Sequence, residues 1–224
     1  AAANKPEEVV PDEPEFIEEP LEPEAIAKPK LVKLIIQAAL ANSTIALETI
    51  IKASPDQINF PGPTGETPLH FAARLGKSNN VALLLKHKAK VDVKDNDGNT
   101  PLHAAGIGIG DAEGICRMLL AHGADVDARD NLRGTPLAKA AGYGSLSIAK
   151  LLISKGADVT SADLYGATPL HKAENLAMAK LLIKSGANVK ATTKKGESVA
   201  DRAAGTKRPE IVEFLVSQGS PAPK

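Results

Sequence analysis

The sequence predicts an all-α solenoid of about six helix-turn-helix units, and two observations carry this prediction. A Thr-Pro-Leu phrase recurs at Thr67, Thr100, Thr135 and Thr168, with spacings of 33, 35 and 33 residues. Each copy is followed by an apolar run and then by an Ala-x-Val phrase, as in "GADV" at 123–126. A fixed period near 33 residues is typical of repeat proteins, whose units stack side by side.

The composition fits a packed helical chain and excludes several classes of protein. Of the 224 residues, 43% are hydrophobic and only 3% aromatic, so alanine and leucine must fill the core. The single cysteine, Cys116, rules out an internal disulfide. No run of 18 apolar residues occurs, which argues against insertion in a membrane.

The first thirty residues form a separate acidic, proline-rich segment. Residues 1–30 hold nine Asp or Glu, three Lys and six Pro, so their formal charge is 3 − 9 = −6, against 24 − 18 = +6 for the rest of the chain. This composition leaves little to bury and predicts an extended or disordered arm. Phe16, Ile17 and Leu21 are its only sizeable apolar cluster and could dock on the body or on a partner.

Each unit has the local chemistry of two short helices joined by turns. Thr67 is a good N-cap, and Pro68 suits the first helical position because an N–H there would lack a partner. Leu69 and the following alanines give the first helix a narrow apolar stripe, and a glycine such as Gly123 suits the left-handed residue after the second helix. Six units are expected in residues 31–219, near 31–62, 63–95, 96–129, 130–162, 163–193 and 194–219, followed by a tail at 220–224.

These phrases resemble the ankyrin repeat: Thr-Pro-Leu-His, an alanine pair, a second helix and Gly-Ala-Asp-Val. The resemblance covers residues 31–219. It implies antiparallel helix pairs, a β-hairpin-like finger between successive units, and terminal units that cap the stack with a polar outer face. Three departures are visible: the repeat at 98–129 has two extra residues, the repeat at 166–193 is three short at its helix–helix turn, and Ala138 replaces the usual histidine.

The glycine-rich stretch "AAGIGIGDAEG" at 104–114 raises the question of a phosphate-binding loop. Gly106 and Gly108 begin a Gly-x-Gly-x-x-Gly pattern, but Asp111 stands in place of the third glycine, and a helix rather than a strand is expected before it. A Gly-Lys-Ser/Thr phrase is absent as well. We therefore interpret the stretch as a lengthened, flexible turn whose two isoleucines could anchor a partner, and we expect no nucleotide or other cofactor.

Other motifs do not favour a metal site or catalysis. His70, His103 and His171 recur in successive units, but stacked helices lie roughly 8–10 Å apart, whereas a histidine ligand lies about 2 Å from zinc. By the resemblance, each histidine is expected to hydrogen-bond within the loops of its own and neighbouring units. Residues 95–98 have the spacing of part of a calcium-binding loop, but the positions of the first and last ligands of that loop are not acidic. Cys116 is expected on a buried helix face without an activating base, so no catalytic residue is predicted.

The resemblance implies that the fingers and the adjoining first helices form a concave face that grips partner proteins. Both tyrosines of the chain, Tyr143 and Tyr165, fall on this face, and tyrosine is among the commonest hot-spot residues. The predicted partner-binding residues are Arg74, Leu75, Asn96, Asp97, Asn99, Ile107, Ile109, Asn131, Leu132, Arg133, Tyr143, Leu164, Tyr165, Asn175, Lys194 and Lys195.

The last unit is basic, with Lys190, Lys194, Lys195, Arg202, Lys207 and Arg208. A solvated cap accounts for these charges, and the alternative is an acidic partner or the chain's own acidic arm. Aromatic residues are not interleaved with the lysines, so a nucleic-acid partner is not expected.

The predicted function is binding of another protein, without chemistry of its own, by a chain that is a monomer when unbound. Two sharper hypotheses remain open. The first is an inhibitor or immunity protein, resembling exported bacterial ankyrin proteins, that covers the active site of a partner enzyme. An alanine-rich start without Met motivates it and slightly favours a periplasmic or secreted location over a cytoplasmic one. The second is a cytosolic adaptor or host-directed effector that recruits a partner.

Overall fold

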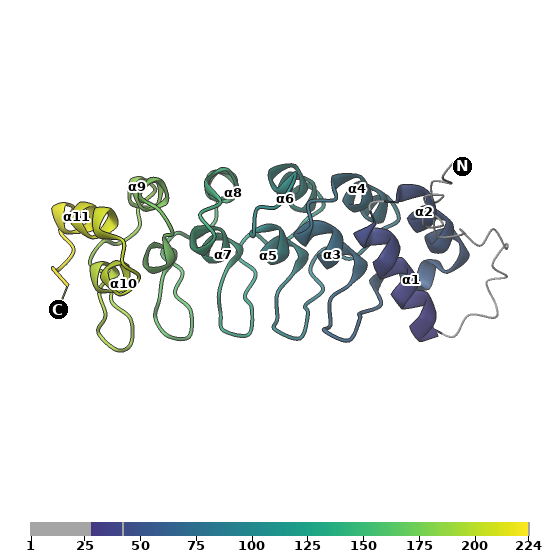
Figure 1. The fold of residues 1–224 in the computed structure, drawn as a ribbon, viewed down its shortest axis with the longest axis horizontal. Helices are drawn as coiled ribbons and strands as arrows, with labels where there is room; N and C mark the ends of the chain where they lie inside the picture. Colours follow the sequence, from purple (N-terminus) through teal and green to yellow (C-terminus); the bar gives the residue numbers. More distant parts are fainter. Residues whose placement is uncertain (1–27, 42, 224) are drawn as a thin grey trace, which may run out of the picture.

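The computed structural model describes residues 28–41 and 43–223, which form six helix pairs stacked side by side. First helices lie in one layer and second helices in another, and loops project from the first-helix layer (Figure 1). The pairs, called units 1 to 6, are α1 (Lys28–Leu40) and α2 (Thr44–Ala53), α3 (Pro68–Arg74) and α4 (Ser78–Lys86), α5 (Pro101–Ala105) and α6 (Ala112–Ala121), α7 (Pro136–Gly142) and α8 (Leu146–Ser154), η3 (Pro169–Lys172) and α9 (Leu176–Lys184), and α10 (Val199–Gly205) and α11 (Pro209–Ser217).

The all-α solenoid predicted from the sequence is confirmed, with small additions. A short 3-10 helix, η2 (Pro55–Asn59), follows α2, and the described residues contain one isolated β-bridge, between Thr192 and Ser198. Helix α1 begins at Lys28, so the last three residues of the expected arm are helical. The rest of the arm, with its apolar cluster, lies outside the described residues.

The Thr-Pro-Leu-His phrase builds the start of each first helix and ties it to the next unit. The backbone N–H of Thr67 donates to Nδ1 of His70 at 3.1 Å, so that nitrogen carries no proton. The proton is therefore on Nε2, which donates to the carbonyl of Asn99 at 2.9 Å. His103 repeats the pattern and reaches the Gly134 carbonyl at 3.1 Å. One side chain thus caps a helix and holds the following loop.

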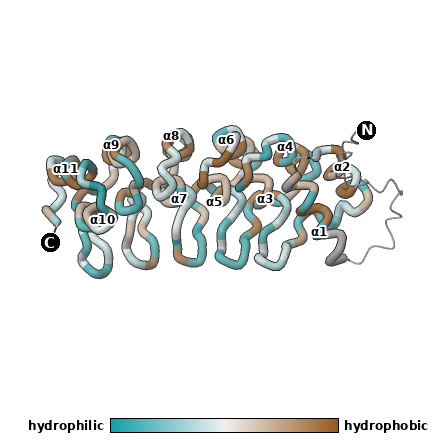
Figure 2. The backbone as a smooth tube through the Cα atoms, in the orientation of Figure 1, coloured by the Kyte–Doolittle hydropathy of each residue, from teal (hydrophilic) through white to brown (hydrophobic). Residues whose placement is uncertain are grey.

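The core lies between the two helix layers and runs the length of the stack. The leucine of each phrase is buried, as at Leu69, Leu102, Leu137 and Leu170. Fully burying one such side chain contributes about 1.5–3 kcal/mol. The alanine pairs are buried beside them and let neighbouring first helices approach closely. Figure 2 shows the consequence: the helices carry most of the hydrophobic residues, and the projecting loops are largely hydrophilic.

The projecting loops form five fingers, at 62–66, 95–99, 130–134, 163–167 and 193–197, called fingers 2 to 6 after the unit that each precedes. A backbone hydrogen bond closes each finger between its first and last residues, and the fourth residue has a left-handed backbone. That residue is glycine in four fingers and Arg133 in finger 4, with φ +62°. The left-handed region costs a non-glycine residue roughly 1–2 kcal/mol.

A chain of backbone hydrogen bonds joins successive fingers. Asn96 N–H donates to Thr64 O (3.0 Å), and Asn131 N–H donates to Asp97 O (2.9 Å). The chain of bonds continues from Leu164 to Leu132 and from Lys194 to Tyr165, each at 2.8 Å. The equivalent donor position in finger 2 is Pro63, which has no N–H, so the chain of bonds cannot extend toward the N-terminus through that residue.

The two-residue insertion falls between α5 and α6, as expected, but the turn is packed rather than free. A side chain on Gly76 would lie 2.4 Å from the Ile109 carbonyl, so the turn touches the preceding unit closely. On the other side, Ser145 Oγ donates to the Ile107 carbonyl at 3.4 Å. The lengthened turn therefore fills the space between its two neighbours.

The three-residue deletion is not where the sequence analysis placed it. The first helix itself is shortened, because η3 is a single 3-10 turn in place of the usual α-helix. Both neighbours support the gap: Glu174 N–H donates to Ala141 O (3.0 Å), and Arg208 donates to Ala173 O (3.1 Å) and pairs with Glu174. The Nε2 of His171 in this unit has no hydrogen-bond partner among the described residues.

Candidate functional site

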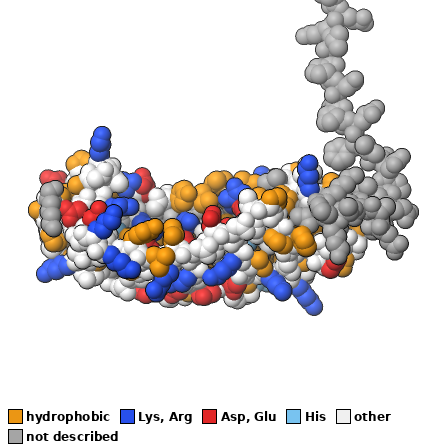
Figure 3. Space-filling view, turned by 90° about the horizontal axis from the view of Figure 1, so that it is seen from below, with side chains coloured by type: hydrophobic (Ala, Val, Ile, Leu, Met, Phe, Trp, Pro, Cys, Tyr) orange, Lys and Arg blue, Asp and Glu red, His pale blue; other side chains and the backbone are white. Residues whose placement is uncertain are grey.

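The concave face implied by the sequence corresponds to the exposed surface of fingers 2 to 6 and of the first helices behind them, called here the finger face. It faces the viewer in Figure 3, where lysine and arginine side chains surround a group of hydrophobic ones toward the C-terminal end. The predicted binding residues divide into three groups by what their side chains do in the structure.

The first group maintains the fold. The side-chain amides of Asn96 and Asn131 donate to the carbonyls of Pro63 (3.2 Å) and Asn96 (2.9 Å), so both brace the preceding finger. Asn99 bonds to Asp95 within finger 3. Arg74 pairs with Glu66 at 3.2 Å and lies over the Phe71 ring, and the half-buried Leu75 ends α3. Asp97 is exposed, and its carbonyl accepts the bond from finger 4.

The second group lies on turns between helices rather than on fingers. Ile107 and Ile109 belong to the turn that packs between Gly76 and Ser145. Asn175 begins α9, and its side-chain oxygen accepts from the N–H of Met178 at 2.9 Å as a helix cap. These three residues are therefore separated from the finger tips, although Ile109 remains 48% exposed.

The third group gathers on the C-terminal half of the finger face. Leu132, Leu164 and Tyr165 are large apolar or aromatic side chains left exposed at the tips of fingers 4 and 5. Tyr143 ends α7 and is 57% exposed, and Tyr165 is 61% exposed. Arg133, Lys194 and Lys195 are exposed on fingers 4 and 6. Only this group presents free side chains of the types that anchor protein interfaces.

Two adjoining hollows lie among these side chains. The larger encloses about 480 Å³ and is lined by Leu132, Tyr165, Lys194 and Lys195, among others. The smaller, of about 170 Å³, is lined by Tyr143 and residues of finger 4 and α7. Lys172 lines both, so the two hollows adjoin and the tyrosines stand in neighbouring compartments.

The electrostatics of the larger hollow are positive. Asp163 pairs with Lys172 at 2.8 Å. Partial burial alone would raise the pKa of Asp163, but the hydrogen bond and charge of Lys172, with the N–H groups of Ala167 and Tyr165, hold that pKa below its usual value. Glu197 pairs with Arg202 at 3.9 Å. Both acids are thus neutralised, and four cations against two acids leave a formal charge of 4 − 2 = +2.

Of the first-helix cations beside the fingers, Arg202 was expected as part of a basic last unit, whereas Lys139 and Lys172 were not expected to belong to the site. Four residues after the helix cap, units 4, 5 and 6 carry Lys139, Lys172 and Arg202, whereas units 2 and 3 carry Phe71 and Ala104. Aligning the repeats at this position would have revealed a row of cations beside the fingers, because the position follows each finger at the same distance along the chain. Lys139 reaches Asp130 of finger 4 at 3.9 Å.

The histidines and the cysteine have structural roles. Burial lowers the pKa of His70, His103 and His171, against the raising effect of the carbonyls they face, so the neutral form is favoured. Burial raises the pKa of the Cys116 thiol to about 12, which keeps it protonated and unreactive. Within residues 28–41 and 43–223 no three His, Cys, Asp or Glu side chains gather where they could hold a metal ion.

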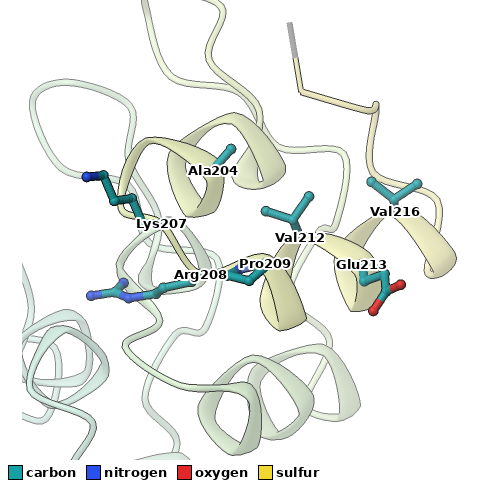
Figure 4. Close-up of a pocket in the computed structure, with 7 residues that line it drawn as sticks. All are labelled: Ala204, Lys207, Arg208, Pro209, Val212, Glu213 and Val216. Carbon is teal, nitrogen blue, oxygen red and sulfur yellow. The ribbon is translucent and has the colours of Figure 1, made fainter.

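A further hollow of about 610 Å³ lies at the C-terminal end of the stack. In Figure 4, Ala204, Val212 and Val216 point into the open space between α10 and α11, while Lys207 and Arg208 point away from it. The outer face of unit 6 is therefore partly apolar rather than wholly polar. It lies away from the finger tips and is not part of the finger face.

Comparison with known proteins agrees with this architecture. A family model described as ankyrin repeats (three copies) matches residues 35–130, 110–193 and 137–222. The chain therefore belongs to the ankyrin repeat family. Ankyrin repeats are generally protein–protein interaction modules and are typically binding scaffolds rather than enzymes. No helix within the described part of the chain is long and apolar enough to span a membrane.

Several curated proteins share part of the repeat array. The chain is 44% identical over 57 residues to the BTB/POZ domain and ankyrin repeat-containing protein NOOT1 of Medicago truncatula, which is 25% of this chain and 12% of that protein. It is 35% identical over 88 residues to a transient receptor potential cation channel subfamily A member 1 homolog of Caenorhabditis elegans (39% and 7%). It is 47% identical over 55 residues to neurogenic locus notch homolog protein 1 of Danio rerio (25% and 2%). The matches span at most about an eighth of these relatives, so they concern the shared repeats.

Proposed function

We propose that the chain binds a partner protein through the C-terminal half of the finger face, around Tyr143 and Tyr165. The observation that carries this proposal is the pair of adjoining hollows, each with an exposed tyrosine on its wall. Exposed aromatic side chains beside a preformed hollow are the usual anchors of an interface, because they bury a large area at little entropic cost.

The scaffold beneath this surface is held by hydrogen bonds between successive units, which favours binding. The fingers are joined to one another through their backbones, and His103 ties α5 to finger 4. A partner therefore meets side chains that are already in place, and little ordering entropy opposes the complex. The finer proposal is that the partner is an enzyme whose active site the fingers cover; an adaptor that only recruits its partner is the alternative.

Affinity capture from lysate and envelope fractions of the source cells tests the proposal. The wild-type chain is compared with Tyr143→Ala/Tyr165→Ala and with a matched control, Ile45→Ala/Phe60→Ala, which truncates exposed apolar side chains at the N-terminal end. We expect the wild type and the control variant to capture a partner protein that the tyrosine variant does not capture. A partner retained equally by all three chains contradicts the site. The activity of the captured partner, free and bound, separates inhibition from recruitment.

A further inference from the structure

We propose that the C-terminal half of the finger face takes an extended acidic segment of the partner protein, anchored by one aromatic or aliphatic side chain. This inference rests on the proposed function and adds the chemistry of the partner. It is carried by the apolar wall, the excess positive charge and the spacing of the cations.

The apolar wall defines the anchor. Leu132 and Tyr165 are 51% and 61% exposed and belong to neighbouring fingers, so together they line one side of the larger hollow. Its volume of about 480 Å³ lies within the range of about 300–1,000 Å³ that is usual for pockets filled by organic ligands. A large apolar side chain entering here would remove the exposed surfaces of Leu132 and Tyr165 from water, which is favourable.

The charges define the rest of the segment. Asp163 and Glu197 are already paired with Lys172 and Arg202. Within the part of the chain that the structure describes, Lys194 and Lys195 form no ion pair, and both are exposed at the tip of finger 6. Two exposed, unpaired cations beside an apolar hollow attract carboxylates and repel a basic segment, and such charge complementarity sets the choice of partner more than the affinity.

The spacing of the cations favours an extended conformation. Lys139, Lys172 and Arg202 occupy one position of three successive first helices, which stack roughly 8–10 Å apart. An extended polyproline II segment rises about 3.1 Å per residue with three residues per turn, so every third side chain lies on the same face, about 9 Å from the last. A carboxylate at every third residue would therefore lie near one cation per unit, where it would share that cation with the finger acid already paired to it. Dense acidic segments also repel themselves into extended forms.

The chain itself contains a segment of similar chemistry. Residues 12–24 hold seven of the nine acids found in residues 1–30 and no basic residue, and they include Phe16, Ile17 and Leu21. A second copy, or the chain's own arm, is therefore the competing occupant. The experiment has to separate it from a partner protein.

The probe is a fluorescein-labelled synthetic peptide of glutamates with one central phenylalanine. Fluorescence anisotropy measures its Kd for the full chain, for Lys194→Glu/Lys195→Glu, and for the control Lys155→Glu/Lys184→Glu, which makes the same charge change on exposed ends of the second helices. Circular dichroism melting verifies that all three fold, and Lys194→Gln/Lys195→Gln replaces the first variant if it does not.

We expect the finger variant to weaken peptide binding about tenfold, since exposed charge pairs contribute modestly each, while the control binds like the wild type. Replacing the phenylalanine of the peptide by alanine should also weaken binding, and replacing its glutamates by lysines should abolish it. Equal binding by the finger variant and the control, or binding of the lysine peptide, would overturn the proposal.

Two further results address the occupant and the link to the proposed function. If Glu18→Lys/Glu19→Lys in the arm tightens peptide binding tenfold, the chain's own arm is the occupant and the proposal is overturned. The proposal is also overturned if the chain self-associates and Lys194→Glu/Lys195→Glu abolishes that self-association, because the arm of a second copy is then the occupant. If affinity capture yields a partner that depends on Tyr143 and Tyr165 but not on Lys194 and Lys195, the proposed function stands and only the acidic chemistry fails.

Discussion

The two halves of the finger face share one backbone and differ in what their side chains do. In fingers 3 and 4 the side-chain amides of Asn96 and Asn131 donate to the preceding finger. At the same position in fingers 5 and 6 stand Leu164 and Lys194, which keep only the backbone bond. At the third position of each finger, fingers 2 and 3 carry Thr64 and Asp97. Fingers 4, 5 and 6 carry Leu132, Tyr165 and Lys195 at that position.

The backbone bonds between fingers therefore suffice to hold the fingers in register. Because the bond between fingers is made by backbone atoms at about 2.8–3.0 Å in both halves, the side chains of the C-terminal half are released for other contacts. The same change runs through the first helices, where Phe71 and Ala104 are replaced by cations in units 4 to 6. Stability and recognition are thus assigned to different atoms of the same repeat.

The largest expected effect separates the core from the site within one unit. Leu137 is fully buried and Leu132 is half exposed, five residues away. We expect Leu137→Ala to lower the free energy of unfolding by about 2–5 kcal/mol through lost burial and a cavity. Leu132→Ala should change that free energy by less than about 0.5 kcal/mol. Urea unfolding measures both, and a comparable loss for Leu132→Ala would show that the finger side chains also carry the fold.

The buried histidines predict a dependence of stability on pH. Burial holds the pKa of His70, His103 and His171 below the unfolded value of about 6.5, so the unfolded chain binds more protons between the two values. Stability is therefore fully present above pH about 6.5 and is lost as the pH falls. His103→Ala, which copies the natural Ala138, should cost about 1–3 kcal/mol at neutral pH and make the pH profile shallower. A profile unchanged by the substitution would contradict the buried neutral state.

A smaller effect is expected where finger 4 departs from the other fingers. Arg133 occupies the left-handed position that glycine fills elsewhere, with φ +62°. Arg133→Gly should stabilise the chain by up to about 1 kcal/mol, since relief of the strain outweighs the added freedom of the unfolded chain. Thermal melting of the two proteins measures the difference, and a lower Tm for the variant would show that the arginine side chain makes a compensating contact.

The smallest effect is expected when the tip of finger 4 is made to resemble that of finger 5. Asn131→Leu removes the 2.9 Å side-chain bond to Asn96 O and copies Leu164 of the next finger. We expect a loss of only about 0.5 kcal/mol, because the bond is exposed and the backbone bond remains. Urea unfolding gives the value, and a loss beyond about 2 kcal/mol would mean that side chains rather than backbone keep the fingers in register.

The repeat phrases were enough to predict the helix pairs, their caps and the buried leucines, because each depends on residues three or four apart. The phrases could not predict that Arg208 and Glu174 would support the shortened unit 5, since those residues are 34 positions apart and belong to different units. The assignment of the tyrosines and the finger-6 lysines as binding residues stays a prediction. Lys172 was missed because its role between two hollows depends on how three units stack.

Amide hydrogen exchange of the chain with and without its captured partner locates the surface that the partner covers. We expect binding to slow exchange at 131–134, 164–167 and 194–197 and to leave 64–66 and 96–99 unchanged, because the partner covers only the C-terminal fingers. Exchange slowed in fingers 2 and 3 alone, or equally in all five fingers, would contradict the assignment of recognition to the C-terminal half.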